Sequence, residues 1–349
     1  MINLQTSFLG SMSVVSHILD LRYSDPSYPL QVVARRFTPK PPTSSGDNVK
    51  QISLLLAHAV GLSTEHYIPF IKRLFEACNE ARPHDVHIRS LWVVDSPNHG
   101  DAALLNTSIL ETQFSSKFPC KTYSEAITQV VQHLLSPEER LELIGLGHSA
   151  GSGVIVGTAL DCPSPFKYHI FIEPGFWTAA ANPIWDVVMA RLQQLSKYRK
   201  PSWPTIKEAM NDLTQQKPYS TFSAEVLDLM QDTSFVESPQ GGVTTKTSIS
   251  REMASMNSYD EGVVLSELAV DLSKSIPTYM LQGERRDFWP KPLNSVIEAT
   301  VSGNSASMRS VQVIPVCSHY PPQENVGVTA KMVLDILISI QSSAQATRL

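Results

Sequence analysis

Residues 141–160, LELIGLGHSAGSGVIVGTAL, decide the fold. The first six residues are a largely apolar run that predicts a buried strand, and the small-residue segment Ala150–Leu160 predicts a helix. At the junction stands Gly147-His148-Ser149-Ala150-Gly151, a G-x-S-x-G string. Such a strand-to-helix turn presents the serine hydroxyl above the sheet, and side chains at the glycine positions would collide with neighbouring elements. We therefore predict that Ser149 is a nucleophile.

The rest of the chain alternates strand-like and helix-like segments. Apolar or β-branched runs predict strands at 14–22, 30–37, 51–57, 86–94, 168–172, 277–282 and 310–316, with helices between most of them. This rhythm predicts an α/β protein with a mainly parallel sheet. Residues 174–272 show helical patterns without a convincing strand, and 240–250 is expected to be a mobile loop. We expect a core of residues 1–173 and 273–349, interrupted by a helical cap of residues 174–272.

A nucleophilic serine needs a base and an acid, and where the serine lies on a strand-to-helix turn of this type they follow it along the chain in the order serine, acid, histidine. His319 is the one histidine downstream of His169, and it directly follows the last predicted strand. It is our predicted base. Glu173, at the end of a predicted strand, and Asp287, in the Gln282–Asp287 segment with Glu284, are the candidate acids. Glu173 is favoured because a charge at that strand end needs a partner, and Asp287 stays open as the alternative.

Two backbone N–H groups are needed to bind an oxyanion. The loop His58-Ala59-Val60-Gly61 follows a central strand and carries small residues, so the amides of Val60 and Ala150 are the candidates. The residues expected to line the substrate site are His58, His99, His148, Phe176 and Trp177. Of these, His58 also suits a purely structural, hydrogen-bonded role.

Composition excludes several classes of protein. With 349 residues, 42% hydrophobic and 17% charged, the chain can bury a large core, and its net charge of −5 argues against nucleic-acid binding. No run approaches the roughly 18–20 apolar residues of a membrane span, and Met1–Ser16 lacks a basic, then apolar, pattern, so we expect neither a membrane span nor secretion. Cys78, Cys120, Cys162 and Cys317 lie far apart, without metal-binding spacing, and are expected to be separate thiols. We expect no metal and no cofactor.

These motifs resemble the α/β-hydrolase superfamily, and the resemblance covers essentially the whole chain. Its markers are the His58–Gly61 loop, the Gly147–Gly151 turn, an insertion after the sixth core strand and the terminal motif His319–Glu324. More narrowly, Asp95–Asn106 (DSPNHGDAALLN) is similar to fungal secondary-metabolism hydrolases, which include the peroxisomal acyl-CoA hydrolase of mycophenolic acid biosynthesis and host-selective-toxin hydrolases. In the mycophenolic acid enzyme the acid lies on the strand before the cap, which matches Glu173, although there it is an aspartate.

The expected activity is that of a serine hydrolase cleaving a carboxylic ester or an acyl-CoA thioester, with a bulky apolar secondary metabolite as substrate. Two alternatives are an acyl-transfer cyclase or transferase with the same triad, and a non-catalytic ligand-binding relative. The basic run Lys197–Lys200 could meet CoA phosphates or be a solvated helix end. Thr347-Arg348-Leu349 is a weak match to a peroxisomal import signal, so peroxisome and cytoplasm are both open, as is a homodimer.

Overall fold

The computed structural model describes residues 3–9, 12–20, 28–40, 51–80, 86–160 and 163–346. Its main sheet has nine strands in the order β1-β2-β3-β5-β4-β6-β7-β10-β11. The six strands from β5 to β11 are parallel, whereas β1, β2 and β3 pair antiparallel. This arrangement confirms the predicted mainly parallel α/β sheet. The strands are β1 Asn3–Leu9, β2 Met12–Asp20, β3 Gln31–Pro39, β4 Gln51–Ala57, β5 His87–Val94, β6 Leu143–His148, β7 Tyr168–Ile172, β10 Thr278–Gly283 and β11 Ser310–Ile314.

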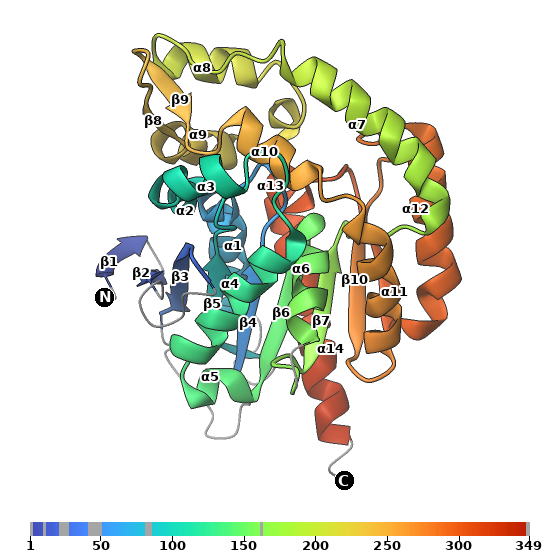
Figure 1. Ribbon diagram of the computed structural model, residues 1–349. Helices are drawn as coiled ribbons and strands as arrows, with labels where there is room; N and C mark the ends of the chain where they lie inside the picture. The colour runs from blue at the N-terminus through green and yellow to red at the C-terminus, as the bar shows by residue number, and fades with distance from the viewer. Residues whose placement is uncertain are drawn as a thin grey trace.

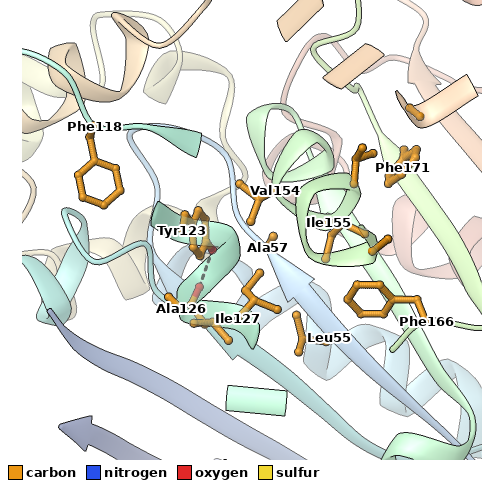
Figure 2. Close-up of a cluster of buried hydrophobic side chains, with 14 of the residues drawn as sticks. Leu55, Ala57, Phe118, Tyr123, Ala126, Ile127, Val154, Ile155, Phe166 and Phe171 are labelled. Carbon is orange, nitrogen blue, oxygen red and sulfur yellow. Dashed lines mark hydrogen bonds between the residues drawn. The ribbon is translucent and has the colours of Figure 1, made fainter. Parts of the chain in front are cut away.

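Helices cover both faces of this sheet, because the central strands are apolar on both sides. Leu54 and Leu56 of β4 face the layer of α1 (Ile68–Glu80) and α14 (Val326–Ala346). Leu55 and Ala57 face the opposite layer, which contains α4 (Cys120–His133), α6 (Ala150–Ala159) and α11 (Glu261–Ser273). Figure 2 shows Leu55 and Ala57 close to side chains of α4 and α6. Continuous burial on both faces is what the run QISLLLA predicts.

Most of the segment between β7 and β10 lies over the end of the sheet where α6 begins (Figure 1). Its elements are α7 Asn182–Ser196, α8 Ile206–Leu213, α9 Ala224–Thr233, β8 Phe235–Glu237, β9 Val243–Thr245, α10 Ile249–Met256 and α11. The expectation of no strand here was wrong, because β8 and β9 form a hairpin. Each has three residues, too few for an alternating pattern to show. The expected loop 240–250 contains β9, entered through Gly241 and Gly242, which both have positive φ.

The remaining helices are α2 Gly100–Leu105, α3 Thr107–Gln113, α5 Pro137–Leu141, α12 Lys291–Asn304 and α13 Pro321–Glu324. Short 3-10 turns occur at Thr64–Tyr67, Ala179–Ala181, Tyr219–Thr221 and Ser305–Ser307. Because β1 precedes the first predicted strand, the insertion follows the seventh strand of the chain instead of the sixth. Division into a core and a cap at residues 174–272 stays a prediction. Its last helix, α11, packs beside the sheet against α6.

Three further predictions concern a membrane span, the four cysteines and the C-terminal tripeptide, and the structure describes only some of the residues involved. Within the described ranges, no helix has the length and apolarity to cross a bilayer. Cys78, Cys120 and Cys317 are free thiols, while Cys162 lies outside the described residues. The C-terminal tripeptide Thr347-Arg348-Leu349 also lies outside them.

Candidate active site

Ser149 occupies the turn between β6 and α6. Its backbone has φ 54° and ψ −125°, in the left-handed region that L-residues seldom adopt. A Cβ atom at Gly147 would overlap the backbone of Ser152, and one at Gly151 would overlap the carbonyl oxygen of Ala57. Both flanking positions of the motif therefore require glycine, and the strained serine is held by the strand before it and the helix after it.

His319 lies between the serine and a carboxylate. It follows β11, and its Nε2 is 2.8 Å from Ser149 Oγ. Its Nδ1 is 3.2 Å from Glu173 Oε2, and the imidazole is almost fully buried. In the tautomer these contacts favour, the serine hydroxyl donates to Nε2 and the Nδ1–H group donates to the carboxylate. That is the arrangement a histidine needs to accept the serine proton.

Glu173 directly follows β7 and is itself strained, with φ 46°. Its Oε1 accepts a hydrogen bond of 2.6 Å from the Gly283 N–H group, and Arg286 Nη1 lies 2.8 Å from the same atom. One carboxylate oxygen is thus anchored to β10 and a guanidinium, which leaves Oε2 to face His319. No motif in the sequence pointed to Arg286 as this partner.

The two other carboxylates considered from the sequence lie elsewhere. Asp287 forms a half-exposed ion pair of 2.9 Å with Lys217. Hydrogen bonds from the side chains of Ser318 and Lys217 lower the pKa of Asp287 below its usual value. Glu284 Oε2 accepts a hydrogen bond of 2.8 Å from the Val316 N–H group. The structure therefore brings Glu173, and neither of the alternatives, against His319.

The loop that carries Val60 is held by backbone hydrogen bonds of the residues before and after it. The N–H group of Ala59 donates to Tyr67 Oη at 3.0 Å, and that of Gly61 donates to His99 Nε2 at 2.9 Å. Val60 lies between them and lines the same cavity as Ser149 and Ala150. Ala150 is the first residue of α6, where helix N–H groups have no intrahelical acceptor. The two candidate amides thus flank the serine on rigid supports.

His58 and His99 line the cavity, but their ring nitrogens are engaged by neighbours. His58 Nε2 accepts from the Ser96 N–H group at 2.8 Å, and its Nδ1 faces the Ala59 carbonyl oxygen at 2.8 Å. Burial lowers the pKa of His58 to about 4, so it stays neutral. His99 Nδ1 contacts Asn98 Oδ1 at 2.7 Å. Their hydrogen bonds shape the loops around the serine.

His148 was expected to line the substrate site, and the structure contradicts this. It does not line the cavity beside Ser149; its Nδ1 lies 2.6 Å from Tyr67 Oη and its Nε2 lies 2.8 Å from the His319 carbonyl oxygen. Burial, with a smaller contribution from His319, lowers the pKa of His148 to about 3. A chain of hydrogen bonds therefore joins Ala59, Tyr67, His148 and His319. Tyr67 has helical spacing with the apolar residues of α1, so the sequence indicated only a core position.

The cavity beside Ser149 has a volume of about 250 Å³ and a mostly apolar wall. Trp177 lines it, as predicted, whereas Phe176 packs in the core against Phe171, with ring centroids 5.4 Å apart, and does not line it. Phe288 stacks on the His319 ring at 4.6 Å and 6°. The other apolar lining residues include Phe118, Val154, Trp185, Met256, Leu265 and Trp289. Across the described ranges, no group of three or more His, Cys, Asp or Glu side chains could hold a metal ion.

No protein-family model matches this chain. Among curated proteins, type I acyl-CoA thioesterase mpaH from Penicillium brevicompactum is 24% identical over 190 residues, which span 52% of this chain and 39% of that protein. The match thus covers well under half of the relative's length. It agrees with the similarity to fungal acyl-CoA hydrolases expected from the residues 95–106.

Solved structures are similar over almost the full chain. The peroxisomal α/β-hydrolase Lpx1 from Saccharomyces cerevisiae has a TM-score of 0.71 at 16% identity, covering 97% of this chain and 89% of that one. A thioesterase domain from the curacin biosynthetic pathway has a TM-score of 0.57 at 15% identity, covering 96% and 99%. The chain has the α/β-hydrolase fold.

Proposed function

We propose that the protein is a serine hydrolase in which Ser149, His319 and Glu173 form the catalytic triad. The observation that carries the proposal is the hydrogen-bonded series from Ser149 Oγ through His319, at 2.8 Å, to Glu173, at 3.2 Å. Each member comes from a different strand end, and the serine backbone is strained. An idle serine would need neither the strain nor the aligned imidazole.

The reaction proceeds through an acyl-enzyme. His319 Nε2 takes the Ser149 proton while Oγ attacks the carbonyl carbon, and the Val60 and Ala150 amides bind the resulting oxyanion. His319 then gives the proton to the leaving alcohol or thiol as the carbonyl–heteroatom bond breaks. Water, deprotonated by the same imidazole, attacks the acyl-serine, and His319 returns the proton to Ser149 Oγ as the acyl–oxygen bond breaks and the acid is released. Glu173 stabilises the imidazolium in both halves, and Arg286 keeps its carboxylate oriented.

The substrate class proposed is an ester or an acyl thioester with an apolar acyl group. Support comes from the aromatic wall of the cavity, which includes Trp177, Trp185 and Trp289. The acyl-CoA thioesterase among the relatives and the thioesterase domain among the structural neighbours make a thioester the first substrate to try. Peroxisomal location remains a proposal, supported by the peroxisomal neighbour Lpx1.

The test is a panel of acyl-CoA thioesters and matched oxygen esters, with release of thiol and of acid measured together. The wild-type protein should hydrolyse members of this panel, and Ser149→Ala should lose at least roughly 10³-fold in kcat, as expected when a triad nucleophile is removed. Mass analysis of the products separates hydrolysis from the alternative in which a substrate hydroxyl intercepts the acyl-enzyme. Undiminished activity in Ser149→Ala would refute the proposal.

A further inference from the structure

A second cavity adjoins the active-site cavity. It has a volume of about 880 Å³ and is lined mainly by residues of the segment between β7 and β10. Four residues line both cavities: Ser196, Arg199, Glu252 and Met253. We call these four residues the neck. A substrate too large for the inner cavity would pass through the neck into the outer one.

An ion pair lies at the neck. Arg199 Nη1 is 3.0 Å from Oε1 and 2.9 Å from Oε2 of Glu252, and the two side chains are 32% and 25% exposed. Arg199 follows α7, whereas Glu252 belongs to α10. The Glu252 side chain also lies against Gly61, beside the candidate oxyanion loop. Both side chains are partly exposed toward the cavities, so an anion of the substrate could reach the guanidinium and replace the Glu252 carboxylate there.

The charges around the neck single out Arg199. Among the described residues, it is the one Lys or Arg that lines the active-site cavity, and Glu252 is the one Asp or Glu that does so. The outer cavity is also lined by Lys197, Lys200 and Lys246; Lys200 pairs with Asp212 at 3.3 Å and Lys246 with Asp101 at 2.6 Å, whereas Lys197 lines only the outer cavity and not the neck. A guanidinium offers paired N–H donors that match the oxygens of a carboxylate or phosphate.

We propose that Arg199 binds an anionic group of the substrate at the neck, and that Glu252 occupies Arg199 until the substrate arrives. The inference rests on the proposed hydrolase function and names the substrate class further: an ester or thioester that carries a carboxylate or phosphate near the scissile bond. The anion could belong to the acyl group or to the leaving group. Glu252 then competes with the substrate anion for Arg199. Removing Arg199 should therefore weaken the turnover of anionic substrates, and removing Glu252 should strengthen it.

The experiment compares three thioesters of equal acyl length in wild-type, Arg199→Gln and Glu252→Gln proteins. Hexanoyl-N-acetylcysteamine is neutral, adipyl-N-acetylcysteamine has a carboxylate on the acyl group, and hexanoyl-CoA has phosphates on the leaving group. The quantity measured is kcat/KM for each anionic thioester divided by that for the neutral one. For at least one anionic source, this ratio should fall about tenfold or more in Arg199→Gln and rise severalfold in Glu252→Gln. The source whose ratio moves identifies where the anion lies.

A purely structural ion pair would move the ratio in the same direction, or leave it unchanged, in both variants, and either outcome overturns the inference. Lys274→Gln, which removes one charge of a surface pair with Asp271, controls for net charge and should leave the ratio unchanged. If Lys200→Gln lowers the ratio as far as Arg199→Gln does, the anion is held by the outer cavity generally and the assignment to Arg199 is wrong.

Failure of the proposed function looks different. In that case the wild-type protein turns over none of the thioesters and Ser149 is not labelled by an alkyl fluorophosphonate. If Ser149 is labelled but turnover is slow, the same ratio is taken from the labelling rates of two fluorophosphonates of equal length, one ending in a methyl group and one in a carboxylate. Equal ratios in all variants then refute the inference about Arg199 alone.

Discussion

Replacing Tyr67 with phenylalanine should weaken both the fold and the active site, because its hydroxyl group joins the loop after β4 to the end of β6. Tyr67 Oη accepts from the Ala59 N–H group at 3.0 Å and lies 2.6 Å from His148 Nδ1. Both of those groups are buried, and neither gains a new partner from a phenyl ring. An orphaned buried polar group costs about 1–3 kcal/mol, so the free energy of unfolding should fall by about 2–4 kcal/mol.

The same substitution should slow catalysis beyond its effect on stability. Without Tyr67 Oη, the loop that carries Val60 loses one anchor, and His148 loses the partner that orients its bond to the His319 carbonyl oxygen. A missing oxyanion donor costs roughly 10²–10³ in kcat, and a displaced donor should cost less, about tenfold or more. The assay is urea unfolding together with the rate of Ser149 labelling by a fluorophosphonate, normalised to the folded fraction.

Tyr28→Phe is the matched control. Tyr28 is also buried, and its hydroxyl donates to the Thr122 carbonyl oxygen at 3.1 Å; neither residue lines the cavity beside Ser149. It should lower stability and leave the labelling rate of folded protein unchanged. If Tyr67→Phe also labels at the wild-type rate, the hydrogen-bonded chain does not position the active site and the reasoning is refuted.

Three other predictions follow from the geometry. Glu173→Gln should reduce kcat roughly 10³–10⁴-fold with little change in KM, because the amide cannot hold the productive imidazole tautomer; steady-state kinetics with a turnover loss below tenfold would contradict this. Gly151→Ala should fail to fold or lose more than about 3 kcal/mol, since its Cβ overlaps a backbone oxygen, whereas Gly303→Ala, with open space around its Cβ, should be tolerated in the same thermal-unfolding assay. Acid should destabilise the protein as the pH falls below about 6.5, because burial lowers the pKa of His58 to about 4 and those of His148 and His169 to about 3, so the unfolded chain binds protons that the folded state does not. Each of these histidines should lower the free energy of unfolding by about 1.4 kcal/mol per pH unit, and His169→Phe should remove one such contribution. A free energy of unfolding that does not change between pH 6.5 and 4.5 would contradict this prediction.

The parts of the fold that the sequence predicted are those with local causes. The largely apolar runs at 51–57 and 141–146 predict buried strands of a mainly parallel sheet, and G-x-S-x-G identifies the turn at Ser149 because only glycine fits beside it. The hairpin of β8 and β9 was missed because three residues are too short for a periodic signal.

The parts that were missed depend on how distant segments meet. Glu173 and Asp287 both follow strands next to the site, and the choice between them depends on the left-handed backbone at Glu173 and the bond to Gly283, neither of which has a sequence signature. His148 was expected at the substrate site because it precedes the serine, but its ring is buried between Tyr67 and the His319 carbonyl oxygen, two partners that are distant in the sequence. Arg199 and Glu252 are separated by 53 positions, on segments whose packing no motif encodes.

The most direct test of the central claim is intact-mass analysis of the protein after reaction with an alkyl fluorophosphonate. The wild-type protein should gain one phosphonyl group, located on Ser149 by peptide mapping, and lose hydrolytic activity in proportion. Folded Ser149→Ala should gain none, and Glu173→Gln should be labelled much more slowly. Labelling of a different residue, or none in protein that hydrolyses an ester or thioester, would contradict a catalytic role for Ser149.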